Sequence, residues 1–170
     1  MNAWREIIGL ASDYLKRHDV PDPQTAAELL AARLLKCGRG FLASHLEETV
    51  PERYLDAMRR AMARLAGGEP IQYVLGEWDF RKLTLKCDRR ALIPRPETEE
   101  LVERVVRFAK AGVPSAGGGK PLFVDVGTGS GCIILSLASE LENGLFLGTD
   151  ISPEAVSLAQ ENAERCGLSG

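Results

Sequence analysis

The chain has 170 residues, of which 45% are hydrophobic and 26% are charged, with a formal net charge of −3. This composition is typical of a folded globular protein and is too apolar for a disordered one. No run approaches the ~18 consecutive apolar residues that a membrane-spanning helix needs. The N-terminus also lacks the basic flank and apolar run of a secretory signal. We therefore expect a soluble, cytoplasmic protein that does not contact a membrane.

The first 68 residues are predicted to form a small helical bundle. Apolar residues recur there every three or four positions, which places them on one face of each helix. Asp22-Pro23 offers an N-cap and a first-turn proline for the second helix. Thr49-Val50-Pro51-Glu52 fits a capping box that opens the third helix, and Gly67-Gly68 mark its end.

Residues 69–96 are predicted to form a β-hairpin that links the bundle to the rest of the chain. Leu83, Leu85 and Cys87 alternate with polar residues, which is the period-two pattern of a strand. The apolar stretch within 70–80 offers its partner.

The remainder, 97–170, is predicted to be an α/β segment. Two apolar runs have the length and composition of buried parallel strands, and helical patterns precede and follow them. We expect a right-handed β-α-β-α unit. The predicted elements are a helix from Thr98, a strand at 122–126, a helix at 132–141, a strand at 145–150 and a helix from 153 to about 166.

Charge is unevenly distributed along the chain. Positions 81–95 hold six basic residues and one acidic residue, whereas 122–170 hold seven acidic residues and one basic residue. The basic stretch has two interpretations. It meets an acidic or nucleic-acid surface, or it is a solvated hairpin.

The four cysteines suggest neither a metal site nor a disulfide framework. They lie far apart in the sequence, form no Cys-x-x-Cys pair and have no histidine nearby. We expect small, buried or half-buried hydrophobic side chains and no metal. The cysteines are Cys37, Cys87, Cys132 and Cys166.

A glycine-rich loop between the first α/β strand and its helix carries the strongest functional signal. Glycines let a ligand approach the backbone, and the following helix presents free N–H groups. The second strand ends in Asp150, whose carboxylate can accept two hydrogen bonds from a ribose diol. The predicted cofactor-binding residues are Asp125, Gly127, Thr128, Gly129, Ser130, Gly131 and Asp150.

The loop does not fit the common phosphate-binding patterns. The dinucleotide fingerprint would need glycine at position 132, where the chain has Cys132. A phosphate loop needs Ser or Thr after Gly-Lys, but Gly119-Lys120 is followed by Pro121. No basic residue near the loop balances a phosphate. Acids at both strand ends favour a cationic, phosphate-free nucleoside, and S-adenosyl-L-methionine is such a ligand. The alternative is a tight strand-to-helix turn without a ligand.

The loop together with Thr149-Asp150-Ile151-Ser152 resembles a class I methyltransferase. The strings Leu92-Ile93-Pro94-Arg95-Pro96-Glu97-Thr98-Glu99 and Glu69-Pro70-Ile71-Gln72-Tyr73-Val74-Leu75-Gly76 resemble the HemK/PrmC family, the glutamine-N5 methyltransferases of peptide chain release factors. The resemblance implies an α/β protein with a helical substrate-recognition domain (1–68), a β-hairpin linker (69–96) and the start of a Rossmann-like methyltransferase domain (97–170), truncated.

The family implies methyl transfer from S-adenosyl-L-methionine to the side-chain amide of the glutamine in the Gly-Gly-Gln motif of release factors. There an Asn-Pro-Pro-Tyr motif orients this poorly nucleophilic amide. The chain contains no Asn-Pro pair. We therefore expect a fragment with the donor half-site, no catalytic residue, weak or undetectable donor binding and no turnover. Two alternatives stay open. They are a non-catalytic release-factor docking module and a DNA amino-group methyltransferase, for which 81–95 is the only support, so nucleic acid is not the expected substrate.

Overall fold

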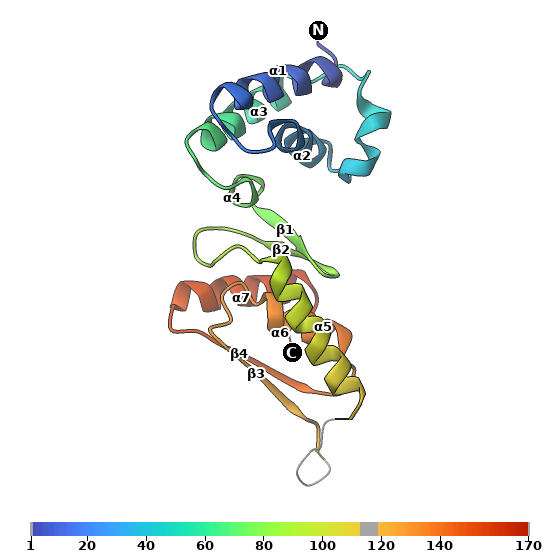
Figure 1. The fold of residues 1–170 in the computed structure, drawn as a ribbon, viewed down its shortest axis with the longest axis vertical. Helices are drawn as coiled ribbons and strands as arrows, with labels where there is room; N and C mark the ends of the chain where they lie inside the picture. The colour runs from blue at the N-terminus through green and yellow to red at the C-terminus, as the bar shows by residue number, and fades with distance from the viewer. Residues whose placement is uncertain (1, 113–118, 170) are drawn as a thin grey trace. The chain divides into compact units, whose positions relative to one another are not determined.

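The computed structural model describes residues 2–112 and 119–169 (Figure 1). The chain divides into two compact units, Met1–Leu75 and Gly76–Gly170. The sequence of 111–120, which contains three consecutive glycines, predicts a flexible surface loop, and most of this stretch lies outside the described residues. Among the helices that the structure does describe, none is long and apolar enough to cross a membrane.

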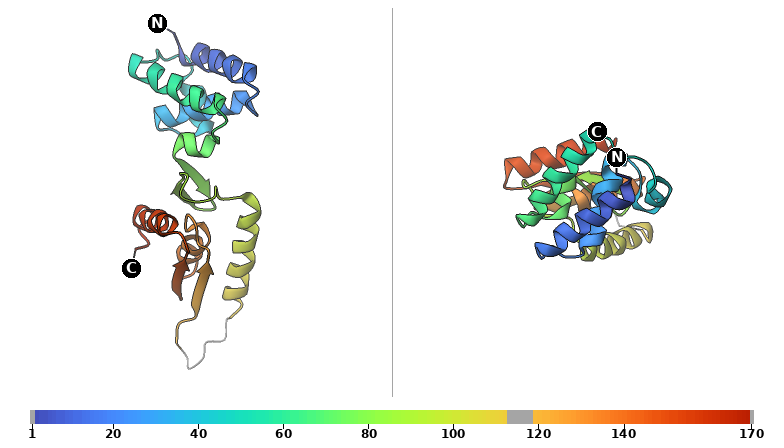
Figure 2. Two further views of the ribbon diagram at one scale, coloured as in Figure 1. Left: turned by 90° about the vertical axis from the view of Figure 1, so that its left-hand side faces the viewer. Right: turned by 90° about the horizontal axis from the view of Figure 1, so that it is seen from above.

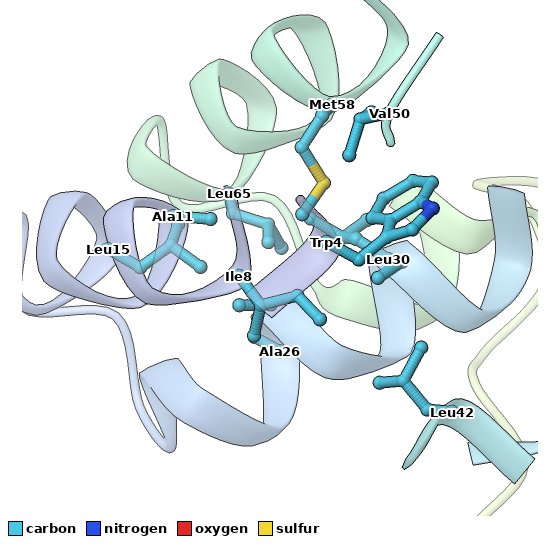
Figure 3. Close-up of a cluster of buried hydrophobic side chains, with 12 residues drawn as sticks. Trp4, Ile8, Ala11, Leu15, Ala26, Leu30, Leu42, Val50, Met58 and Leu65 are labelled. Carbon is cyan, nitrogen blue, oxygen red and sulfur yellow. The ribbon is translucent and has the colours of Figure 1, made fainter. Parts of the chain in front are cut away.

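The first unit is a bundle of helices around one apolar core, as predicted. Trp4, Ile8 and Leu15 lie along one face of the first helix and are at most 4% exposed (Figure 3). Leu30 from the second helix and Met58 from the third complete the centre of this core. The elements are α1 (Trp4–Arg17), α2 (Pro23–Leu35), the 3₁₀ helix η1 (Arg39–His45), α3 (Glu52–Ala66) and α4 (Ile71–Leu75).

The predicted capping box at the start of α3 is wrong. The N-cap of α3 is Pro51, and no side chain caps the helix. Thr49 instead forms an antiparallel bridge with Ala3, and the neighbouring Val50 N–H donates to the Asn2 carbonyl at 3.0 Å. Because α3 begins at Glu52, Thr49 lies two residues before the N-cap and belongs to this bridge instead of the helix.

The second unit combines a hairpin with a parallel βαβα segment, which confirms the α/β class. Strands β1 and β2 are antiparallel, with Phe80 opposite Leu83. Strands β3 and β4 are parallel, and α6 packs against both (Figures 1 and 2). Part of the stretch within 70–80 that was expected to pair with β2 is the helix α4. The elements are β1 (Glu77–Phe80), β2 (Leu83–Lys86), α5 (Pro96–Lys110), β3 (Leu122–Val126), α6 (Cys132–Glu140), β4 (Leu145–Thr149) and α7 (Pro153–Arg165).

One face of the β3–β4 sheet is packed and the other is exposed. Phe123 and Phe146 stack with ring centroids 5.3 Å apart and join the apolar core of α5 and α6. On the opposite face Val126 is 84% exposed. Among the described residues, the two apolar runs thus form parallel strands that are packed on one face only. The exposed side chains of this face are Leu122, Val124, Val126, Leu145 and Leu147.

Arg81 fixes the hairpin to the helices of the second unit. Its backbone lies in the left-handed region (φ 51°), where the hairpin turns. Its guanidinium donates to both carboxylate oxygens of Glu140 in α6, at 2.6 and 3.0 Å, and to Glu103 in α5 at 2.8 Å. The Glu140 side chain is only 5% exposed. Hydrogen bonding to Arg81 lowers the pKa of Glu140.

We predict that Leu15→Ala destabilises the first unit by about 2–5 kcal/mol, because a buried leucine loses its transfer energy and leaves a cavity. Leu10→Ala is the matched control on the same helix, since Leu10 is 60% exposed. It should change the free energy of unfolding by no more than about 0.5 kcal/mol. Urea denaturation followed by circular dichroism measures both. Equal losses in the two variants would contradict this packing.

We predict that Arg81→Met destabilises the second unit in a pH-dependent way. The pKa of Glu140 is lowered in the folded state, so its ion pair stabilises fully above the unfolded value of about 4.5 and less as the pH falls through the folded value. The difference in unfolding free energy between wild type and Arg81→Met should therefore shrink between about pH 6 and about pH 3.

Lys82→Met is the control for this experiment, because the Lys82 ammonium contacts the same carboxylate at 3.6 Å and is 74% exposed. An exposed ion pair contributes little. Its unfolding free energy should stay close to wild type at both pH values. A pH-independent effect of Arg81→Met would show that Glu140 is not the partner that matters.

Candidate functional site

The predicted site residues meet at one edge of the β3–β4 sheet. The strands are parallel and in register, with Val126 opposite Thr149, so their carboxyl ends lie side by side. The loop 127–131 leaves the end of β3, and Asp150 follows the end of β4. Ligands of open α/β sheets bind at this edge. The structure thus brings the loop and Asp150 together.

Backbone hydrogen bonds hold the loop against β4. The N–H groups of Gly127 and Thr128 both donate to the Thr149 carbonyl oxygen, each at 2.8 Å. The Gly131 N–H donates to the Thr128 carbonyl at 2.8 Å and closes the turn into α6. Gly127, Gly129 and Gly131 have φ angles of 83°, 55° and 81°. This left-handed backbone is strained for residues with a side chain, which explains the three glycines.

Asp150 is oriented toward the loop by two backbone donors. Its Oδ1 accepts from the Ser152 N–H at 3.0 Å, and its Oδ2 accepts from the Gly129 N–H at 2.9 Å. The bond from Ser152, and then that from Gly129, lowers the pKa of Asp150, so the carboxylate is ionised at neutral pH. A carboxylate accepts about four hydrogen bonds. Asp150, half-buried, keeps capacity for further donors.

A side-chain hydrogen bond connects Thr128 in the loop to Asp125 in β3. The Thr128 hydroxyl donates to Asp125 Oδ2 at 2.8 Å, and Thr128 itself is buried. A Cβ at Gly148 would lie 2.8 Å from that hydroxyl, so glycine in β4 makes room for Thr128. Ser130 is also buried, and its hydroxyl has no hydrogen-bond partner among the described residues. The side chains of Thr128 and Ser130 therefore face the protein.

The three loop glycines differ in their surroundings. A Cβ at Gly127 would meet no atom within 4 Å, and one at Gly129 would lie 3.7 Å from Ala91 Cβ. A Cβ at Gly131 would lie 2.9 Å from Leu135 Cδ1 and 3.2 Å from Ala159 Cβ. Gly127 thus borders open space, whereas a side chain at Gly131 would overlap Leu135 of α6 and crowd Ala159 of α7.

The sequence patterns missed one buried polar residue beside the loop. Asn162 lies in the buried stripe of α7 with Ala155 and Leu158, and its side chain hydrogen-bonds to the Ser130 carbonyl at 2.9 Å. The signal that could have found it is a polar side chain within an apolar helical stripe, since such groups need buried partners.

The basic stretch 81–95 is largely paired with acids of the same unit. Arg90 contacts Glu161 of α7 at 2.6 Å and Asp88 at 2.8 Å, and Lys86 contacts Glu161 at 2.7 Å. These bonds, first from Arg90 and then from Lys86, lower the pKa of Glu161 to about 2. This pairing favours the solvated-hairpin interpretation over a nucleic-acid surface.

The cysteines are characterised by their burial and by the pKa values of their thiols. Burial raises the pKa of the Cys87 thiol to about 11 and also raises that of Cys132, the first residue of α6, so both thiols are protonated at neutral pH. Within 2–112 and 119–169, no group of three or more histidine, cysteine or acidic side chains could hold a metal ion. Cys87 is buried and the other three cysteines are half-buried, as predicted.

We predict that Gly131→Ala destabilises the second unit more than Gly127→Ala. Both substitutions place a Cβ on a left-handed backbone at a cost of about 1–2 kcal/mol. Only Gly131→Ala also overlaps Leu135 and Ala159, for which overpacking adds about 1–3 kcal/mol. Urea denaturation of the two variants measures the difference. Equal losses would contradict the close packing at Gly131.

Two protein families match the chain. Residues 6–76 match the PrmC N-terminal domain, and residues 122–170 match a methyltransferase domain. A release factor glutamine methyltransferase of Koribacter versatilis is 41% identical over 95% of this chain and 55% of its own length. The MTRF1L release factor glutamine methyltransferase of Homo sapiens is 34% identical over 96% of this chain and 49% of its own length.

A release factor glutamine methyltransferase of Lactococcus lactis is 44% identical over 70% of this chain and 42% of its own length. The chain thus spans about half the length of the curated relatives it matches. The N-terminal match covers the helical bundle, and the second match covers the loop and Asp150. The chain therefore combines a match to the PrmC N-terminal domain with a match to part of a methyltransferase domain, and it is similar to release factor glutamine methyltransferases over about half of their length.

Proposed function

We propose that this chain supplies the methyl-donor half-site of a release factor glutamine methyltransferase. The observation that carries the proposal is the ionised carboxylate of Asp150, which backbone donors hold toward the glycine loop at the carboxyl edge of two parallel strands. The matches to release factor glutamine methyltransferases support the reaction class.

The proposed donor is S-adenosyl-L-methionine, which supplies an electrophilic methyl group on a sulfonium. The free acceptor capacity of Asp150 suits the two hydroxyls of a ribose. The open space at Gly127 suits the close approach of a ligand to the loop backbone. The proposed donor-binding residues are Asp125, Gly127, Thr128, Gly129, Ser130, Gly131 and Asp150. Thr128 and Ser130 act through their backbone, because their side chains are buried.

The proposed acceptor is the side-chain amide of a release-factor glutamine. This follows from the names of the relatives, and release factors are then the protein partners. In this proposal, residues 1–68 recognise the release factor and residues 97–170 bind the donor. Residues 69–96 link these two parts of the chain. The proposed compartment is the cytoplasm, where translation terminates in bacteria. The 170 residues contain no Asn-Pro pair, so the group that orients the amide is not among them.

That missing motif favours one second candidate, a release-factor docking module without activity of its own. The two candidates differ in a measurable way. A half-site binds the donor, however weakly, whereas a pure docking module does not.

We predict that titration of residues 1–170 with S-adenosylmethionine, followed by ¹⁵N nuclear magnetic resonance, shifts the amide signals of 127–131 and Ser152. This method detects the weak binding expected here. Asp150→Ala should weaken the fitted affinity roughly tenfold or more, because the charge-assisted hydrogen bonds to the ribose are lost. Glu142→Ala removes the same charge from an exposed position of the same unit and should leave the affinity unchanged.

Shifts spread over the whole unit, or equal affinities in Asp150→Ala and Glu142→Ala, would contradict the proposed donor site. No shifts at all would favour the docking module. We also expect no methyl transfer from labelled S-adenosylmethionine to a release factor by residues 1–170 alone. Efficient transfer would show that residues 1–170 do contain a group that orients the acceptor amide.

A further inference from the structure

Asn162 is the only fully buried amide side chain among the described residues, and all of its hydrogen-bonding atoms are engaged. Its Oδ1 accepts from the Lys86 N–H at 2.6 Å. Its Nδ2 donates to the Lys86 carbonyl at 3.2 Å and to the Ser130 carbonyl at 2.9 Å. One side chain thus joins the last residue of β2 to the glycine loop.

The three partners specify an amide at this position. An acceptor must face the Lys86 N–H, while two donors must face carbonyl oxygens. If the amide were rotated by half a turn, its Nδ2 would face the Lys86 N–H, and its Oδ1 would face the two carbonyl oxygens. None of the three hydrogen bonds could then form. Leucine offers neither group and would leave buried backbone atoms unpaired, and aspartate would turn an acceptor toward two carbonyls.

Asn162 holds the part of the loop that β4 does not reach. Thr149 and Asp150 bind the N–H groups of Gly127, Thr128 and Gly129 from the β4 side. Asn162 binds the carbonyl of Ser130 from the α7 side. The loop is therefore held from two directions before any ligand arrives, which reduces the cost of ordering it on binding.

A separate contact keeps the hairpin in place independently of Asn162. The neighbouring Glu161 pairs with Lys86, which is the last residue of β2, and with Arg90, which follows β2. Removing the amide therefore releases the Ser130 carbonyl while these ion pairs still fasten the segment 86–90 to α7. The effect of a substitution at 162 should concentrate on the loop.

We propose that Asn162 is a positioning residue that keeps the loop 127–131 in its donor-binding shape by fastening the Ser130 carbonyl to the end of β2. The inference rests on the proposed donor site. Asn162 acts through the loop backbone and makes no contact with the donor.

Asn162→Ala tests this role, with Val102→Ala as a control of comparable destabilisation. Val102 is fully buried in α5, and it takes no part in the hydrogen bonds of the loop. Ser136→Ala is a second control, because Ser136 is equally buried and its hydroxyl has no partner among the described residues. Hydrogen exchange of the Gly127, Thr128 and Gly131 amides reports the loop. Exchange of the β2 amides other than that of Lys86, which itself donates to Asn162, reports the hairpin.

In Asn162→Ala we expect loop amides to exchange about tenfold faster relative to β2 amides, as loss of a buried hydrogen bond allows. The dissociation constant for S-adenosylmethionine should rise about tenfold as well. Val102→Ala should accelerate loop and β2 amides alike and leave donor affinity at the wild-type value. Ser136→Ala should change neither. Should Asn162→Ala fail to fold, Asn162→Ser, which keeps a small polar side chain, takes its place.

Uniform acceleration in the Asn162 variant, with donor affinity equal to that of Val102→Ala, would overturn the inference and leave Asn162 a structural residue only. If wild type itself shows no donor-induced shifts, the proposed donor site fails. The exchange comparison between loop and β2 amides does not depend on the donor, so it still decides whether Asn162 holds the loop.

Discussion

One carbonyl oxygen, that of Thr149, sets the shape of the candidate site. It accepts the N–H groups of both Gly127 and Thr128 at 2.8 Å, so the chain must turn as soon as β3 ends. That turn requires a left-handed backbone, which glycine adopts without strain. It also points the Gly129 N–H at Asp150, whose ionisation the bond favours. The parallel register of β3 and β4 thus determines both the loop and the position of the carboxylate.

The two oppositely charged stretches of the sequence form ion pairs with each other in this structure. Basic residues of 81–95 and acidic residues of 122–170 meet in space, as in the pairs Arg81–Glu140 and Arg90–Glu161. Such pairs fasten the hairpin to α6 and α7. A cluster of like charges in a sequence therefore indicates a binding surface only after its partners within the fold have been found. Here those partners lie about 60–70 residues away along the chain.

Local patterns predicted most of the helices and strands, although not α4 or η1, and they predicted the seven site residues that the structure brings to one edge. Long-range contacts decided the rest. The spacing of the glycines and the acidic residue at the end of the second strand are local features of the sequence. The bridge that displaces Thr49 from the α3 cap joins residues far apart in sequence. So do the bonds of Asn162, and no periodicity encodes which carbonyl a buried amide will meet. Whether the seven residues bind a donor remains a prediction.

The contacts that form the loop all lie within Gly76–Gly170. The helices of Met1–Leu75 have their own core around Trp4 and Leu15, and none of their described residues takes part in the loop's hydrogen bonds. Among the described residues, the hydrogen bonds that shape the loop therefore do not involve the helical unit. Substitutions in the Trp4 core should lower the stability of the first unit, whereas substitutions around Ser130 should change the loop of the second unit. The exposed apolar face of β3 and β4 is a separate feature, because its side chains project from the sheet and not from the loop.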